Sequence, residues 1–428
     1  MPSLTALKNK LSQRRKLRRP TGFRFAIADT LGQLNPEHWD AATAGHSWFF
    51  SRDYLGVLEA APPDCLSPRY ALISDADGPV AAVVMQWAEL ERDRLRPTPG
   101  RVAPADGKRA RLKQFLGRAA AGSGSAVATR LSERVLVCGN LLSYGMHAVA
   151  MAPDVDPEAL WPAVAEVLYR VRRAEKLAGQ AGFVMIKDAT DRETPALRVL
   201  EGLSYRSVET EPDMVLALPP GWKTHDDYLA SLASKYRSAV KNQITEPVRQ
   251  AGLAVRVFEV DEALQARMHA LYLQVHENAS LRPFTLHPGY FGTLARAAGE
   301  RLRCSGVFDG DNTLLGFIAT LRDGHAENNR ALAYHIGFDR QAAETHPLYL
   351  RLLHASIAEA ISMGASELSF GRTALDPKAR LGARPQPMQV WVRHRQPVIN
   401  QITRRMLGLL RHDEAPERNP FKAAPREG

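Results

Sequence analysis

The chain has 428 residues, of which 45% are hydrophobic and 24% charged, so it is long enough for two domains and too apolar to be disordered. The formal net charge of +10 predicts an anionic partner, although an arginine-rich composition without such a partner gives the same sign. Three scattered cysteines, with no CxxC motif and no Cys/His cluster, argue against a disulfide framework and against a bound metal.

The two ends of the sequence are basic. Residues 1–19 are predicted to form a basic arm with a thin stripe of leucines, and residues 401–428 a basic tail. Such segments suit transfer RNA or a peripheral contact with an anionic membrane, and a solvated arm is the alternative. There is no signal-type apolar core and no apolar run near the roughly 20 residues of a transmembrane helix. With unpaired cysteines, this predicts a cytoplasmic protein.

Residues 20–218 are predicted to be a first α/β domain. Apolar and polar residues alternate over 23–27 as in a half-buried strand, and Asn35-Pro36 marks a helix start. Two apolar strands flank the turn Asp75-Ala-Asp-Gly78, which predicts a hairpin. Residues 91–130, rich in Pro, Gly, Ala and Arg, are expected to be a basic surface insertion. The elements expected after it are a strand at 135–138, an amphipathic helix at 157–177, and strands at 183–187 and 215–218.

Residues 219–400 repeat this order after the break Pro219-Pro-Gly221. The elements expected are a helix at 226–250, a strand at 254–260, two helices within 262–299, a hairpin around Asp309-Gly-Asp-Asn312, a strand at 331–338, a helix at 348–363, and strands at 367–370 and 389–393. A weak repeat of roughly 190 residues predicts two tandem domains of one fold. Each is expected to be a mixed sheet with helices on both faces.

Three stretches of the second domain stand in a distinctive order. They are the helix at 228–241, the hairpin at 306–319, and the run 348–371 followed by Lys378-Ala-Arg-Leu-Gly382. In this order they resemble the Fem-type peptidyltransferases and the BioF2-like acetyltransferase domain of the GNAT superfamily. The resemblance is good over 222–395 and looser over 22–218. It implies an acyltransferase built from two tandem GNAT-like domains of mixed α/β fold.

Three cations lie beside the apolar seam of the predicted helix at 226–250. They are Lys235, Arg237 and Lys241, of which the last two share one face. Unpaired cations on one face suit a diphosphate or a carboxylate, which makes them candidate substrate-binding residues. An ordinary solvated basic face is the alternative.

Lys378 follows the strand at 367–370. In a GNAT-like sheet this places it near the cleft where parallel strands part, the position that ligands favour in such sheets. A lysine there suits the oxyanion of a tetrahedral intermediate in acyl transfer to an amine, or else a substrate phosphate. Arg372, from the same stretch, is a further candidate for substrate binding. A surface lysine is the alternative for Lys378.

Tyr334 and His335 are adjacent on the predicted strand at 331–338. Alternation along a strand places their side chains on opposite faces, so only one of them reaches the cleft. His335 is a candidate general base for the attacking amine, and Tyr334 is the second catalytic candidate. A packed, hydrogen-bonded strand position is the alternative for either residue.

Acetyl-CoA-dependent GNAT domains resemble one another in a glycine-rich loop that directs backbone N–H groups at the pyrophosphate. The corresponding residues, 339–347, contain no glycine, and Glu344 would repel the ligand. This argues against conventional coenzyme A binding. In the first domain the run 139–145 also departs from that loop, and Asn140 and Tyr144 are expected to line a cleft there.

The leading hypothesis is amide-forming transfer of an activated acyl or aminoacyl group to an amine. The donor would be aminoacyl-tRNA or acyl-CoA, and the acceptor an anionic or nucleotide-linked precursor of envelope or natural-product type. One alternative is an acyl-CoA-dependent N-acetyltransferase with a non-standard coenzyme A site. Another is an inactive tandem that binds an anionic ligand. No bound cofactor and no metal are expected, and the sequence predicts no oligomeric state.

Overall fold

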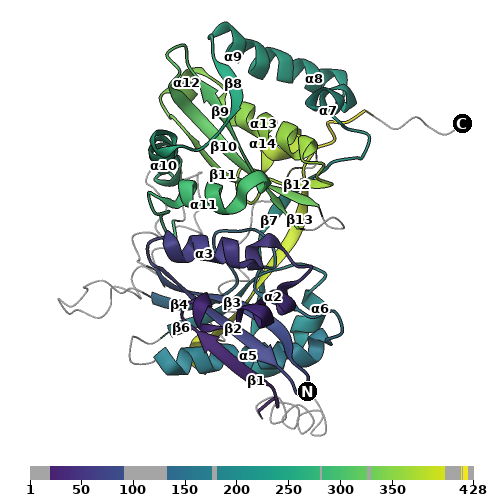
Figure 1. Ribbon diagram of the computed structural model, residues 1–428. Helices are drawn as coiled ribbons and strands as arrows, with labels where there is room; N and C mark the ends of the chain where they lie inside the picture. Colours follow the sequence, from purple (N-terminus) through teal and green to yellow (C-terminus); the bar gives the residue numbers. More distant parts are fainter. Residues whose placement is uncertain are drawn as a thin grey trace, which may run out of the picture.

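The computed structural model describes residues 20–90, 133–175, 181–279, 282–324, 329–400, 416 and 418–422. Within them, thirteen strands form one mixed sheet that runs through the whole molecule (Figure 1). The strand order is β1-β2-β3-β4-β6-β13-β7-β12-β11-β10-β9-β8, and β5 pairs with β3. The strands are β1 (Arg24–Ala28), β2 (Leu66–Ser74), β3 (Pro79–Leu90), β4 (Glu133–Cys138), β5 (Val149–Met151), β6 (Ala181–Ala189), β7 (Arg206–Ala217), β8 (Ala254–Phe258), β9 (Leu302–Phe308), β10 (Leu314–Asp323), β11 (Arg330–Phe338), β12 (Glu367–Ser369) and β13 (Arg384–His394).

Helices cover both faces of the sheet in the first half of the chain. They are α2 (Pro36–Thr43), α3 (Arg52–Ala60), α5 (Pro157–Ala174) and α6 (Thr194–Leu197). Asn35 caps α2 by accepting a hydrogen bond from the His38 N–H, as the Asn-Pro signal predicts. Trp39 of α2 and Tyr54 of α3 pack on one face, and Trp161 of α5 packs on the other.

The second half repeats this arrangement. Its helices are α7 (His225–Ser231), α8 (Ser234–Val240), α9 (Glu246–Gln250), α10 (Glu262–His276), α11 (Tyr290–Ala298), α12 (Ala342–Thr345), α13 (Leu348–Ser362) and α14 (Leu375–Arg380). Helices α10 and α11 cover the face that α2 and α3 cover in the first half, and their apolar side chains belong to the same core cluster. Helix α13 packs on the opposite face. The helix predicted at 226–250 is broken after Ser231 and contains a π-helical turn at Lys241–Thr245.

The last strand of each half lies beside the other half. Strand β13 pairs with β6 over Gln389–His394 and with β7 over Arg384–Val392, while β7 pairs with β12 on its other side. Trp391 of β13 is 1% exposed and belongs to the core beneath α5. Each half therefore completes the sheet of the other, and a boundary near residue 219 divides the chain but not the sheet.

Two predicted segments, 1–19 and the insertion at 91–130, lie outside the described residues, as does most of the tail at 401–428. Among the described residues, no helix is long and apolar enough to cross a membrane. Within the same ranges, no group of three or more His, Cys, Asp or Glu side chains is placed to hold a metal ion. Among the described residues, no disulfide joins Cys65, Cys138 and Cys304.

The shared sheet predicts that residues 20–218 do not fold when expressed alone. Such a fragment leaves β6 without β13 and removes Trp391 from the core, and deleting a buried aromatic side chain alone costs about 3–5 kcal/mol. Far-UV circular dichroism and denaturant titration, with the full chain as control, measure this. A monomeric fragment with cooperative unfolding would contradict the exchange of strands.

Candidate functional site

The candidate site lies where the parallel strands β11 and β12 part. They pair over three residue pairs, from Arg330–Glu367 to Leu332–Ser369, after which β12 ends while β11 continues to Phe338. In open α/β sheets, ligands bind outside the carboxyl ends of parallel strands. We call the region beyond Leu332 and Ser369 the strand divergence.

Strand β11 bulges at the strand divergence. Ala319 of β10 pairs with His335 and Thr320 pairs with Ala333, which leaves Tyr334 as the extra residue. The rings of Tyr334 and His335 therefore lie together, with centroids 4.1 Å apart. Our expectation that these two side chains point to opposite faces was wrong, because the bulge interrupts the alternation. Both catalytic candidates of this strand face helix α11.

A chain of buried hydroxyls crosses from one half to the other. The Tyr334 hydroxyl is 2.8 Å from that of Tyr54 in α3 and 3.0 Å from that of Tyr290 in α11. The Tyr290 hydroxyl is in turn 3.4 Å from His335 Nε2. Asn140 Nδ2 donates to the Tyr54 hydroxyl at 2.7 Å. We call these five residues the hydroxyl chain.

The Asn140 amide fixes one direction in the hydroxyl chain. Because an amide N–H donates, the Tyr54 oxygen accepts from Asn140. Asn140 Oδ1 is held by the Leu142 N–H at 3.0 Å, so the amide orientation is fixed.

Burial keeps the members of the hydroxyl chain neutral. It raises the pKa of Tyr54 to about 12 and that of Tyr334 well above its usual value. It also lowers the pKa of His335 to about 3. A histidine with that pKa is a weak base at neutral pH, which disfavours the role of general base expected from the sequence. The tyrosines, in contrast, stay protonated and able to donate.

The turn from Gly371 to Ala374 is strained at the carboxyl end of β12. Its φ angles are +70° at Gly371, +67° at Thr373 and +46° at Ala374. For a residue with a side chain, this region costs roughly 1–3 kcal/mol, and such residues gather at functional sites. Lys378 holds the turn, since its Nζ donates to the carbonyls of Gly371 at 3.1 Å and Arg372 at 2.6 Å.

Lys378 is 4% exposed, and burial lowers its pKa to about 8. Two of its three donors are used on the turn, so it is not the surface lysine of the alternative interpretation. Its position near the strand divergence agrees with the sequence-based expectation, and its chemical role there stays a prediction.

The first half reaches this turn through the loop after β4. The ring of Tyr144 packs against Gly371, where an added Cβ would come within 2.6 Å of it. Only glycine allows so close an approach. Arg372 forms an ion pair with Asp188, at the end of β6. Tyr144, Arg372 and Lys378, three predicted site residues, thus surround one turn.

Buried ion pairs fix the strands around the strand divergence. Asp213 of β7 accepts hydrogen bonds from Arg330 of β11 at 2.5 Å and from Ser369 Oγ of β12 at 2.7 Å. These bonds connect β7 to both strands at the point where β11 and β12 separate. Lys187 of β6 is paired with Asp188 and donates to the Ser143 carbonyl at 2.7 Å. Such pairs specify one arrangement, because a partner left alone would be an uncompensated buried charge.

A Ser–His–Asp arrangement also joins the halves. Ser143 Oγ lies 2.6 Å from His147 Nδ1, and His147 Nε2 lies 3.6 Å from Asp323 Oδ2 at the end of β10. Ser143 is 1% exposed, and Asp323 also accepts hydrogen bonds from Ser47 and the Trp48 N–H. The burial makes it a connection between the halves and not an accessible nucleophile. Burial also lowers the pKa of His147, against the raising effect of Asp323.

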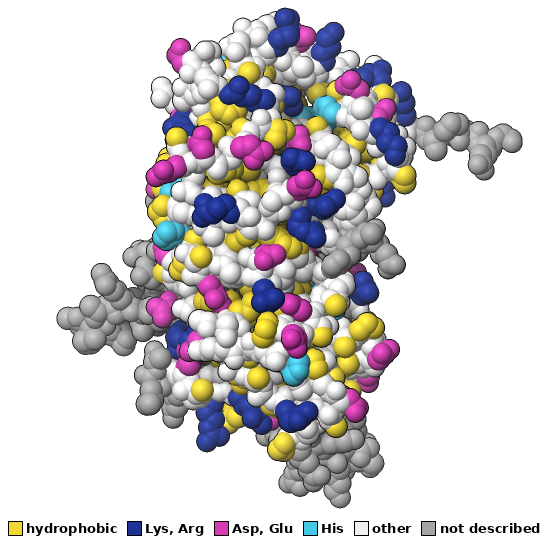
Figure 2. All heavy atoms as spheres, viewed as in Figure 1, with side chains coloured by type: hydrophobic (Ala, Val, Ile, Leu, Met, Phe, Trp, Pro, Cys, Tyr) yellow, Lys and Arg dark blue, Asp and Glu magenta, His cyan; other side chains and the backbone are white. Residues whose placement is uncertain are grey.

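The three predicted cations of the 226–250 segment do not reach the strand divergence. Lys235 and Arg237 lie on α8 and Lys241 on the π-helical turn, and all three are exposed. Figure 1 places α8 at the end of the second half that is remote from the first, and Figure 2 shows Lys and Arg side chains gathered there. Their role in anion binding stays a prediction.

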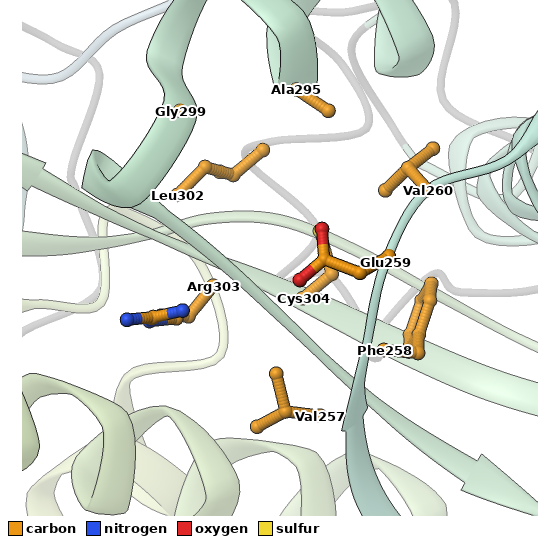
Figure 3. Close-up of a pocket in the computed structure, with 9 residues that line it drawn as sticks. All are labelled: Val257, Phe258, Glu259, Val260, Ala295, Gly299, Leu302, Arg303 and Cys304. Carbon is orange, nitrogen blue, oxygen red and sulfur yellow. The ribbon is translucent and has the colours of Figure 1, made fainter.

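A small cavity of about 40 Å³ lies at the outer edge of the second half, between β8, β9 and α11. Figure 3 shows Glu259 and Cys304 among its lining side chains. This volume holds a water molecule or two. Burial, helped by Glu259, raises the pKa of the Cys304 thiol to about 12, so it is no nucleophile at neutral pH.

Sequence reasoning missed most of the residues of the site. The missed residues are Tyr54, Ser143, His147, Lys187, Asp188, Asp213, Tyr290, Asp323 and Arg330. One sequence signal could have found some of them, namely charged residues at the end of an apolar strand, as in Phe183-Val-Met-Ile-Lys-Asp188. Buried charges need partners, so such residues predict a buried ion pair. Tyr54 and Tyr290 occupy apolar helix faces and carry no signal of their own.

Residues 234–379 match the family of acetyltransferase (GNAT) domains. The matched range includes β11, β12, the strained turn that follows β12, and Lys378. These residues form a GNAT domain. The first half of the chain repeats the arrangement of sheet and helices of this domain. A search of curated proteins returned no significant match.

Solved structures align with this chain at low sequence identity. FemX aligns with a TM-score of 0.50 at 11% identity, covering 86% of this chain and 98% of FemX. A tandem GNAT protein from the clavulanic acid biosynthesis pathway aligns with a TM-score of 0.46 at 11% identity, covering 88% and 99%. L-PGS from Bacillus licheniformis aligns with a TM-score of 0.44 at 11% identity, covering 82% and 95%. The likeness to FemX concerns the fold.

Replacing Tyr54 by Phe should lower the free energy of unfolding by about 1–3 kcal/mol, because it leaves the buried Asn140 amide without its acceptor. The matched control is Tyr169→Phe, which removes a hydrogen bond from a tyrosine that is 44% exposed and should change stability by less than about 0.5 kcal/mol. Urea titration measures both. Equal effects of the two substitutions would show that the hydroxyl chain is not a buried network.

His335 should make the protein sensitive to acid. Its pKa is about 3 when folded and about 6.5 when unfolded, so the unfolded state binds the additional proton between these values. Stability from this residue is complete above about pH 6.5 and is lost as the pH falls toward 3. The stability gap between wild type and His335→Gln should therefore shrink from pH 7 to pH 4.5. A gap that stays constant over this pH range for His335→Gln would refute the assignment.

Proposed function

We propose that this acyltransferase takes its acyl or aminoacyl group from a carrier other than coenzyme A, and joins it to an amine at the strand divergence. Aminoacyl-tRNA is the carrier that the net charge of +10 favours. The acceptor in this proposal is an anionic or nucleotide-linked amine. The observation that carries the proposal is the state of the backbone N–H groups between β11 and α13.

Those N–H groups are already used within the loop. The N–H groups of Ala343, His346 and Leu348 donate to the carbonyls of Asp339, Ala342 and His346 at 3.0, 2.9 and 2.8 Å. The N–H of Ala342 donates to the Asp339 carboxylate at 3.0 Å, and Pro347 has none. A pyrophosphate site needs free N–H groups at a helix N-terminus and no carboxylate beside them. The loop between β11 and α13 contains two carboxylates, those of Asp339 and Glu344.

The proposed chemistry divides between the hydroxyl chain and the strained turn. Acyl transfer to an amine passes through a tetrahedral intermediate whose oxyanion needs preorganised donors. Lys378 is a cation beside the turn, whereas Tyr334 and Tyr290 are buried and their hydroxyls are engaged within the hydroxyl chain. We assign oxyanion stabilisation to Lys378, and the positioning of the bulged strand at the strand divergence to the hydroxyl chain. In this proposal Tyr144 and Arg372 position the substrate.

Acetyl-CoA should not bind tightly to the protein. Isothermal titration calorimetry should show no micromolar binding of acetyl-CoA, because the loop at 339–347 offers no free cradle of N–H groups. Transfer RNA, tested by gel shift at several salt concentrations, should bind and weaken as salt rises. Micromolar binding of acetyl-CoA that survives 0.5 M salt would favour the acyl-CoA-dependent alternative.

Replacing Lys378 by Met should lower turnover by about 100- to 1000-fold with little change in KM, if its charge acts in the transition state. Lys378→Arg should restore little of the lost turnover. A planar guanidinium group does not replace a compact ammonium group that donates to the carbonyls of Gly371 and Arg372. The control is Lys223→Met, at an exposed lysine outside the site. Steady-state kinetics with the identified substrates measures this, and full activity of Lys378→Met would remove Lys378 from catalysis.

A further inference from the structure

A groove of about 890 Å³ lies on the second half, where the end of β7 pairs with β12. Its walls come from the end of β7, the start of β12, the linker at 219–222, the end of α7, the start of β13, and Phe421 and Lys422 of the C-terminal segment. The volume is within the roughly 300–1,000 Å³ of small-molecule sites. Nothing in the acyl-transfer site accounts for it.

The C-terminal segment is fixed in place as a wall of the groove. The Pro420 carbonyl accepts a hydrogen bond from the Ala233 N–H at 2.8 Å, and the Lys422 N–H donates to the Ser231 carbonyl at 3.0 Å. These bonds occupy the break between α7 and α8, where the backbone groups of an unbroken helix would be paired internally. Phe421 packs directly on Gly382, where no side chain would fit. The groove is therefore preformed.

The lining of the groove is mainly apolar, and its charged side chains leave an excess of positive charge. The apolar side chains are those of Val215, Leu216, Ala217, Pro219, Trp222, Ala230 and Phe421. Glu367 is paired with Arg330 at 3.2 Å. Arg384 and Lys422 are exposed, and neither has an ion pair within the described part of the chain. An apolar trough with two free cations is complementary to a hydrocarbon chain that ends in an anion.

We propose that this groove binds a free long-chain carboxylate, with the hydrocarbon chain along Trp222 and Phe421 and the carboxylate at Arg384 and Lys422. Neither Lys378 nor any residue of the hydroxyl chain lines the groove, so the proposal does not depend on the proposed donor. Burying each CH₂ group of the chain favours binding, so affinity rises with chain length.

The test uses the full chain and dodecanoate below its micellar concentration. Bromododecanoate should quench a saturable part of the tryptophan fluorescence, and Trp222→Phe should abolish that part. Calorimetry with dodecanoate should give an affinity that falls about tenfold in Arg384→Ala. The matched control Arg198→Ala, at an exposed arginine of the first half, should bind as wild type does. Ala230→Trp, at an exposed position of the groove wall, should block binding without unfolding the protein.

Three outcomes would overturn the proposal. Dodecanol binding as tightly as dodecanoate would remove the role of the two cations. Equal affinity of Arg384→Ala and Arg198→Ala would do the same. Binding to phosphatidylglycerol vesicles without binding of monomeric dodecanoate would make this surface a membrane contact instead of a site for a free ligand.

Discussion

Strand β13 is the element on which the rest of the structure depends. It lies between β6 and β7, so every element of the strand divergence is positioned through a sheet that neither half can complete alone. Backbone groups of a central strand must be paired, which makes the exchange costly to undo. The relative orientation of the halves is therefore set by ladder hydrogen bonds as well as by contact between side chains.

This constraint explains why polar groups are buried between the halves. The hydroxyl chain, the Asp213 cluster and the Ser143–His147–Asp323 connection each take residues from both halves. Buried polar groups stabilise a structure only when all of them have partners, and a rigid sheet holds those partners in place. The candidate site is thus a property of the tandem. The second domain supplies the divergent strands, and the first supplies Tyr54, Asn140 and Tyr144.

Much of the fold follows from the sequence, but the site follows only in part. Periodicity predicts the hairpin of β9 and β10, and the missing glycines at 339–347 predict an unusual loop. Periodicity does not predict the bulge at Tyr334, since bulges depend on the partner strand, and it therefore assigned Tyr334 and His335 to opposite faces. The pairing of β13 with β6 and β7 cannot be predicted from the sequence either, because the apolar pattern of a strand does not specify which strands it pairs with. Lys378 was found through family resemblance, whereas its buried contacts with the turn appear only in three dimensions.

Hydrogen–deuterium exchange of the full chain tests the shared sheet most directly. If β13 joins the halves, the amides of β6, β13, β7 and β12 should exchange with one common free energy of opening, because none of these strands separates without the others. The measurement is made by mass spectrometry under native conditions, with the edge strand β1 as the internal reference for local opening. Two distinct free energies of opening, one for β6 and another for β13 with β12, would show halves that open independently and would contradict a site built from both.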